Sequence, residues 1–140
     1  EYKKNSANSV EETTVTLLTD ANAISAGRTV YNLNCVACHG ASGEGLVGPN
    51  LTDDYWMHKG GVADVFKSIK YGWPDKGMKS WEQDLKPLEM QQVVSFILSL
   101  RGSNPANAKE KEGDFYGDVS SPKVDSARAD STAVIDSLKR

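Results

Sequence analysis

Three short stretches of the chain repeat apolar residues at helical spacing, and no stretch alternates convincingly between apolar and polar residues. Residues 23–35 place apolar or small side chains along one side, after Asp20, which is suited to cap the start of a helix. Residues 62–71 carry apolar side chains at i, i+3, i+4 and i+7. Residues 87–101 begin with a proline suited to a first helical turn. Gly72 follows the second stretch and Gly102 follows the third, as is typical of helix ends. The pattern predicts an all-α core of short helices.

Polar segments flank this helical region on both sides. Residues 1–20 are rich in Ser, Thr and Asn and lack a helical period, so we interpret them as a linker. Residues 102–140 carry few large apolar side chains and are predicted to be a polar tail, partly disordered or docking. Residues 21–101 then form a single domain. Because the chain begins without Met and without a signal-peptide apolar region, we expect a processed form or a fragment.

Composition and charge exclude some classes of protein. The chain has 140 residues, 39% hydrophobic and 25% charged, as is ordinary for a water-soluble domain. A net charge of −3 disfavours nucleic acid as a partner. The richest apolar run, residues 93–100, is broken by two serines and is too short to cross a membrane. Three short helices bury little apolar area, so a further group is expected to fill the core.

The strongest chemical signal is the stretch Cys35-Val-Ala-Cys38-His39. It contains both cysteines of the chain and one of its two histidines. The spacing C-x-x-C-H allows two thiols to add to the vinyl groups of one haem while the next imidazole binds the iron. About one helical turn separates the two cysteines, which suits them to one porphyrin edge. The motif predicts one covalently attached haem c, with His39 as an iron ligand.

Three other interpretations of these residues compete with haem attachment. A disulfide or thioredoxin-like C-x-x-C normally begins a helix after a strand, whereas this motif ends a predicted helix. A zinc site formed by Cys35, Cys38, His39 and His58 would need adjacent Cys and His ligands, which fits usual zinc spacings poorly. Two structural cysteines beside a chance histidine would leave the turn glycines that follow without a role. Haem attachment accounts for all of these residues together.

These residues also carry a family resemblance. The segments that carry it are Gly27-Arg-Thr-Val-Tyr31, Cys35-x-x-Cys38-His39-Gly40, Gly48-Pro49-Asn50-Leu51, Gly77-Met78 and the final helix with Phe96. From about residue 21 to 101 the chain resembles class I c-type cytochromes. More narrowly, GPNLTDDYWMHKGG, FKSIKYGWPDKGMKSW and MQQVVSFILSLRGSNP are similar to the c-type cytochrome subunit of cbb-type haem–copper oxygen reductases. The chain departs from that family in having one haem motif where many members have two, and in Lys86, where Ser or Thr more often caps the last helix.

The resemblance implies a class I cytochrome c fold and Met78 as the sixth iron ligand. A thioether is soft and neutral, so it favours ferrous iron and raises the reduction potential relative to a second imidazole. Glycines and a proline around Met78 suit a loop that crosses the distal face. Met90 falls on the apolar stripe of the last helix and is expected to be core. Met57 and His58 are the rival ligands, with packing and surface roles as their plainer interpretations.

The resemblance also implies residues that support the iron ligands. The Pro49 carbonyl is expected to accept the N–H of the His39 imidazole, which fixes the ring and raises its basicity. Gly27 and Tyr31 are expected to meet Phe96 where the first and last helices cross. Aromatic side chains are candidates for the walls of the haem pocket and for its carboxylates, although core packing explains them almost as well. These aromatics are Tyr55, Trp56, Trp73 and Trp81, of which Trp56 and Trp81 are the candidates for binding the cofactor.

The function expected from the resemblance is electron transfer rather than catalysis. The domain would pass single electrons to a haem–copper terminal oxidase or a respiratory partner, at the periplasmic or extracytoplasmic side of the cytoplasmic membrane. An upstream anchor, absent from this chain, would provide its only link to the membrane. A free or lipid-anchored cytochrome shuttle is the alternative. A haem enzyme or gas sensor would need an open sixth position, against which Met78 argues.

Lysines near Met78 suggest how a partner would be attracted. They are Lys67, Lys70, Lys76, Lys79 and Lys86. A positive surface there would steer an acidic redox partner and speed the encounter. Acidic residues are interspersed among these lysines, so a solvated face with no partner is the competing interpretation.

Overall fold

The computed structural model describes residues 10–116 of the chain, and within them the fold is mostly helical. In order, its elements are α1 (Ala21–Asn34), α2 (Val36–His39), β1 (Tyr55–Trp56), α3 (Val62–Tyr71), η2 (a 3₁₀ helix, Pro74–Lys76), α4 (Pro87–Ser99) and β2 (Asp114–Phe115). The all-α prediction is confirmed, because the two strands have only two residues each. Such strands are too short to produce an alternating pattern in the sequence.

The helix boundaries follow from local capping chemistry. The Asp20 carboxylate accepts the N–H of Ala23 at 3.0 Å and starts α1, as predicted. At α4, the Lys86 backbone N–H donates to the Glu89 carboxylate at 2.8 Å, which is one half of a capping box. The other half, which a Ser or Thr side chain would supply, is missing because the Lys86 side chain makes no cap hydrogen bond. The predicted helix at residues 87–101 is two residues too long, because α4 ends at Ser99.

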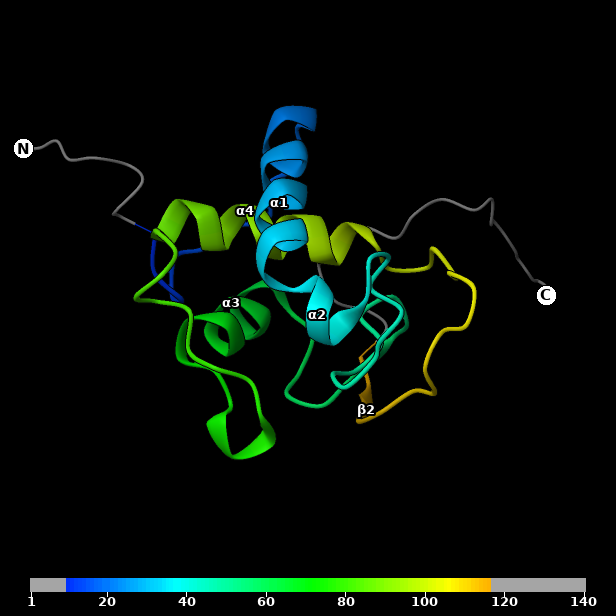
Figure 1. Ribbon diagram of the computed structural model, residues 1–140. Helices are drawn as coiled ribbons and strands as arrows, with labels where there is room; N and C mark the ends of the chain where they lie inside the picture. Colours follow the sequence, from blue (N-terminus) through cyan, green and yellow to red (C-terminus); the bar gives the residue numbers. More distant parts are fainter. Residues whose placement is uncertain (1–9, 117–140) are drawn as a thin grey trace, which may run out of the picture.

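Helices α1 and α4 cross at the top of the molecule as drawn in Figure 1, and they cross at a glycine. A Cβ on Gly27 would overlap the Gln92 carbonyl and lie 2.9 Å from the Phe96 Cβ. The rings of Tyr31 and Phe96 meet beside it with centroids 5.3 Å apart and planes tilted by 58°. The predicted meeting of Gly27 and Tyr31 with Phe96 is confirmed.

The apolar core lies between α4 and the helices that cover it. Helix α4 is buried almost all round, and α3 directs Val65, Phe66 and Ile69 toward it. Met90 is buried within this cluster, which confirms its predicted packing role. Among residues 10–116, no helix is long and apolar enough to cross a membrane.

The described part of the predicted linker, residues 10–19, packs on the helices. The N–H of Leu18 donates to the Ser95 hydroxyl at 2.9 Å, and the Gln91 amide donates to the Thr16 carbonyl at 3.0 Å. Val15 is buried in the same core cluster. The polar composition of this segment concealed these contacts, and its assignment as a linker stays a prediction.

Residues 102–116, which we name the C-terminal strap, pack back on the domain. The Lys109 N–H donates to the Glu44 carbonyl at 2.8 Å, and the Asn50 amide donates to the Lys109 carbonyl at 3.1 Å. Strand β2 then pairs antiparallel with β1. The predicted tail is therefore packed at residues 102–116, through backbone pairing that composition does not reveal. Residues 117–140 of that prediction lie outside the described residues.

Candidate functional site

The Cys-x-x-Cys-His motif lies where α1 turns into the single-turn helix α2. Cys35 caps α1 by donating its N–H to the Tyr31 carbonyl at 2.8 Å. The N–H groups of Cys38 and His39 then point back to the Cys35 carbonyl, at 3.3 Å and 3.0 Å. Both cysteines are free thiols, Cys35 half-buried and Cys38 exposed. One helical turn therefore presents two thiols and an imidazole together.

The protonation of the thiols disfavours disulfide redox chemistry. Burial and, to a smaller extent, the neighbouring Cys38 thiol raise the pKa of Cys35 to about 11. Redox-active C-x-x-C pairs need a lowered thiol pKa, because the thiolate is the nucleophile. The zinc interpretation also loses support, since residues 10–116 contain no group of three or more His, Cys, Asp or Glu side chains placed to hold a metal ion.

The His39 ring is held in one orientation and one tautomer. Its Nδ1 lies 2.9 Å from the Pro49 carbonyl oxygen. A carbonyl can only accept a hydrogen bond, so Nδ1 carries the proton and the Nε2 lone pair remains available to a ligand. Burial lowers the pKa of His39, which keeps the imidazole neutral. A Cβ on Gly48 would lie 2.6 Å from the ring carbon Cε1, so glycine allows the backbone to approach the imidazole closely.

The loop at residues 40–50 folds back over the motif and satisfies its backbone. The buried Tyr31 hydroxyl donates to the Gly40 carbonyl at 2.6 Å. The N–H of Gly48 donates to the Cys38 carbonyl at 2.8 Å. Carbonyls at the end of a helix lack helical partners, and these bonds supply some of those partners. The loop that carries Pro49 is thus fixed to the helix that carries His39.

Met78 closes a tight turn after α3. Backbone hydrogen bonds run both ways between Trp73 and Met78, with the Trp73 N–H donating at 2.8 Å and the Met78 N–H donating at 3.1 Å. Gly77 has a left-handed backbone, φ +93°, which favours glycine. Met78 is partly buried against the core cluster, whereas Met57 is exposed. The chain therefore presents Met78 from a hydrogen-bonded turn.

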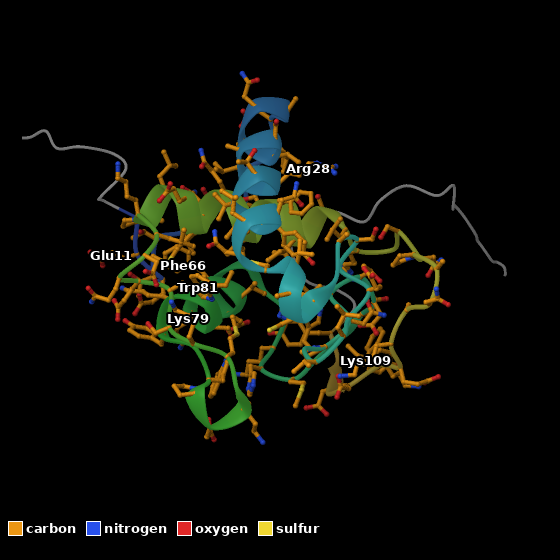
Figure 2. The ribbon with its side chains drawn as sticks, in the orientation of Figure 1. Glu11, Arg28, Phe66, Lys79, Trp81 and Lys109 are labelled. Carbon is orange, nitrogen blue, oxygen red and sulfur yellow. The ribbon has the colours of Figure 1, made fainter. Side chains whose placement is uncertain are left out.

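The aromatic candidates occupy three different environments. The buried Trp56 Nε1 has no hydrogen-bond partner, and its ring lies over Gly60, where a Cβ would be 2.7 Å from Nε1. Trp81 is partly buried against the core, and the Lys79 ammonium lies 4.6 Å from its ring centroid. Figure 2 shows Lys79 and Trp81 together at one side of the molecule. Trp73 is partly exposed on the turn that carries Met78.

The unpartnered indole N–H tests whether these residues fit a haem. A buried donor without an acceptor costs about 1–3 kcal/mol, so native proteins rarely retain one. A haem carboxylate is an acceptor of the kind that Trp56 Nε1 lacks. The paired thiols, the neutral imidazole and this donor are therefore compatible with a covalent haem.

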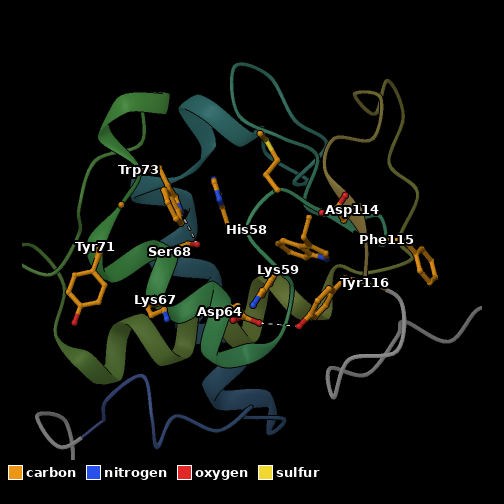
Figure 3. A pocket seen from close by; sticks show the side chains of 13 residues that line it. His58, Lys59, Asp64, Lys67, Ser68, Tyr71, Trp73, Asp114, Phe115 and Tyr116 are labelled. Carbon is orange, nitrogen blue, oxygen red and sulfur yellow. Dashed lines mark hydrogen bonds between the residues drawn. The ribbon is translucent and has the colours of Figure 1, made fainter.

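A groove of about 720 Å³ opens between α3, the segment after β1 and the end of the C-terminal strap (Figure 3). At one edge His58 stacks on Trp73, with ring centroids 3.6 Å apart and planes 11° from parallel. Burial lowers the pKa of His58, and the charge of Lys76 lowers it further. The structure thus places the rival ligand His58 in an aromatic stack.

Two lysines of the predicted positive surface form ion pairs with acidic residues. Lys70 bonds Glu12 at 3.0 Å, and Lys79 bonds Asp84 at 2.8 Å. Lys67 instead lines the groove. Two of the five lysines are therefore partly neutralised, which weakens the predicted positive surface around Met78.

Sequence reasoning missed two features near the site. The Trp73 indole N–H donates to the Ser68 hydroxyl at 2.9 Å, which ties the Met78 turn to α3. The buried Arg101 guanidinium donates to the Asp54 carboxylate at 2.6 Å, just before β1. A serine five positions before a tryptophan gives no recognisable signal, and an arginine at a helix end ordinarily suggests solvent.

Comparison with known proteins places this arrangement among c-type cytochromes. Residues 22–97 match the family described as "Cytochrome C oxidase, cbb3-type, subunit III". The chain is 36% identical over 104 residues to the cbb3-type cytochrome c oxidase subunit CcoP of Azospirillum sp. (strain B510), covering 65% of this chain and 35% of the relative. It is 38% identical over 108 residues to CcoP of Azospirillum brasilense, covering 67% and 37%. The chain thus spans little more than a third of these relatives.

Solved structures show the same fold. Cytochrome cL from Hyphomicrobium denitrificans aligns with a TM-score of 0.54 and 31% identity, over 58% of this chain and 49% of that chain. Cytochrome CL from Methylophaga aminisulfidivorans aligns with a TM-score of 0.53 and 30% identity, over 56% and 53%. The predicted class I cytochrome c fold is confirmed.

Proposed function

This chain belongs to the family of cytochrome c oxidase, cbb3-type, subunit III, and on that premise we propose that it is an electron-transfer domain with one covalent haem c. Its thiols at Cys35 and Cys38 would form the two thioether links. His39 and Met78 would bind the iron. When bound, the haem supplies an iron that alternates between ferric and ferrous and so stores one electron.

The hydrogen bond between His39 and Pro49 is the observation that carries this proposal. It keeps the proton on Nδ1 and leaves Nε2 as the iron-binding atom. Burial lowers the pKa of His39, so protons do not compete strongly for the ring at neutral pH. The close backbone approach at Gly48 then limits rotation of the imidazole. The chain itself thus supplies an oriented, neutral imidazole ligand.

The aromatic residues would complete the site. Trp56 Nε1 would donate to a haem carboxylate, since it is a buried donor without a partner. Trp81 would contribute to the wall of the pocket from its partly buried position. Met78 would bring a neutral thioether, which favours the ferrous state.

The respiratory partner and the compartment follow from the family. The named relatives are subunits of cbb3-type cytochrome c oxidase, so we propose that this domain passes single electrons toward such an oxidase or one of its redox partners. We propose the extracytoplasmic side of the membrane as its compartment, because covalent haem attachment takes place there. A free or lipid-anchored shuttle is the second candidate, because cytochrome cL structures share the fold.

Visible spectroscopy of the haem-loaded protein tests the ligand set. Wild type should show a low-spin c-type spectrum, a weak thioether-to-ferric-iron band and no response to carbon monoxide. Met78→Ala should lose the thioether band, bind carbon monoxide and fall in potential. Met57→Ala is the matched control, since Met57 is exposed and should leave all three properties unchanged. An open iron in wild type would instead support a haem enzyme or gas sensor.

A further inference from the structure

We propose that Trp73 is a positioning residue that holds Met78 at the iron, and that His58 and Ser68 fix Trp73 from two sides. This inference rests on the proposed function, because it takes Met78 as the iron ligand. Three sets of contacts carry it. One is the backbone bridge between Trp73 and Met78. The others are the hydrogen bond of the Trp73 indole to Ser68 and the stack of Trp73 on His58, both of which Figure 3 shows.

The backbone bridge couples the position of Met78 to that of Trp73. Each residue donates its N–H to the carbonyl of the other, at 2.8 Å and 3.1 Å. Between them, η2 and the left-handed Gly77 close the turn, with the Gly77 N–H donating to the Pro74 carbonyl at 3.1 Å. Because both bridge bonds join the same two residues, a displacement of the Trp73 backbone displaces Met78 as well.

The Trp73 side chain then attaches the turn that carries Met78 to two separate segments of the fold. Its indole N–H donates to the Ser68 hydroxyl on α3 at 2.9 Å. The neighbouring α3 residue Ile69 is buried in the core, so Ser68 stands on a firmly packed helix. The face of the indole stacks on His58, 3.6 Å away in the segment that follows β1. The Met78 turn is therefore held from α3 and from the β1 side together.

Burial does not explain why a tryptophan occupies this position. Trp73 is 36% exposed, and its indole lies at the edge of the groove. A large aromatic side chain at the surface of a loop has little core to fill. What its ring and its N–H do provide are two directional contacts, and both restrain the turn that carries Met78.

Competition by an added ligand measures this restraint directly. Imidazole binds ferric iron only when Met78 has left it, so the apparent imidazole affinity rises with the fraction of displaced methionine. Aromatic pairs of this kind are worth a factor of about 2 to 12 in an equilibrium constant. Loss of the stack should raise the imidazole affinity by that factor.

The experiment uses haem-loaded wild type and variants that remove one contact each. His58→Ala should raise imidazole affinity about 2- to 12-fold, and His58→Phe, which keeps an aromatic partner, should restore most of the wild-type value. Ser68→Ala and Trp73→Phe should each raise it by a smaller factor, and the double variant should match the single ones, since both remove the same hydrogen bond. Phe115→Ala removes an exposed aromatic from the same groove without touching the turn and should have no effect.

The outcomes separate this inference from a purely structural role and from the proposed function. A variant that unfolds earlier but binds imidazole like wild type would overturn the positioning role. Equal affinities for His58→Ala and His58→Phe would overturn the part played by the stack. If Trp73→Phe does not fold, the His58 and Ser68 variants still decide the question. Absence of a thioether band in wild type would refute the Met78 assignment itself, before any variant is compared.

Discussion

Replacing Gly27 by alanine sets two physical effects against each other at the crossing of α1 and α4. In an isolated helix, Gly→Ala stabilises by about 1 kcal/mol because glycine loses more backbone entropy on folding. In this fold the new Cβ would overlap the Gln92 carbonyl and lie 2.9 Å from the Phe96 Cβ. The carbonyl belongs to the helical backbone and cannot rotate away, so the two helices must separate.

The structure indicates which effect is larger. Overpacking of a well-packed contact costs about 1–3 kcal/mol, and a clash with backbone belongs at the upper end of that range. Subtracting the helix-propensity gain of about 1 kcal/mol leaves a net destabilisation of about 2 kcal/mol. For a domain of this size, that loss should lower the melting temperature by about 10 °C.

Thermal and guanidinium unfolding of the haem-loaded protein measure this change. Ser25→Ala, at an exposed position of the same helix, is the control and should change the free energy of unfolding by less than about 0.5 kcal/mol. A Gly27→Ala variant as stable as wild type, or more stable, would show that the crossing tolerates a methyl group. The close approach described for α1 and α4 would then be refuted.

Three further predictions concern other contacts. Arg101→Met should cost about 3 kcal/mol in denaturant unfolding by leaving Asp54 without the buried guanidinium, whereas a loss below 1 kcal/mol would argue against a strong pair. The hydrogen bonds of Glu12 to its own backbone and to Lys70 lower its pKa from 4.5 to about 2. The stabilisation of the fold by these hydrogen bonds should be complete above pH 4.5 and lost as the pH falls toward 2. The melting temperatures of Glu12→Gln and wild type should therefore converge in acid. Trp56→Phe should destabilise the haem-loaded protein by about 2 kcal/mol if its N–H meets a haem carboxylate, and an unchanged melting temperature would contradict that contact.

The helices, the start of α1 and the end of α3 were predictable because their signals are local, whereas the end of α4 was placed two residues too late. Apolar spacing, the Asp20 cap and the glycine after α3 lie within one or two turns of the elements they define. The Cys35 to His39 motif is equally local, since five adjacent positions specify its chemistry. These features depend little on the rest of the fold, so the sequence alone sufficed for them.

The packing of both flanks was not predictable, because it depends on contacts between distant residues. Leu18 reaches Ser95, and Lys109 reaches Glu44, through backbone groups that every residue possesses. The anchoring of Trp73 through His58 has the same character, since the stack requires the fold to be in place first. The assignments of Met78, Trp56 and Trp81 to the cofactor stay predictions until a loaded protein is measured.

The crossing of α1 and α4 also sets the order in which the chain can fold. Helix α1 has 14 residues and is marginal in water without a packing partner. Residues 35–86 separate α1 from its partner α4, so α1 stays unpaired until α4 has also reached the compartment in which the domain folds. Closure is a late, long-range event of the kind that slows folding. Cys35, half-buried in the folded domain, therefore remains open to a modifying enzyme throughout that interval.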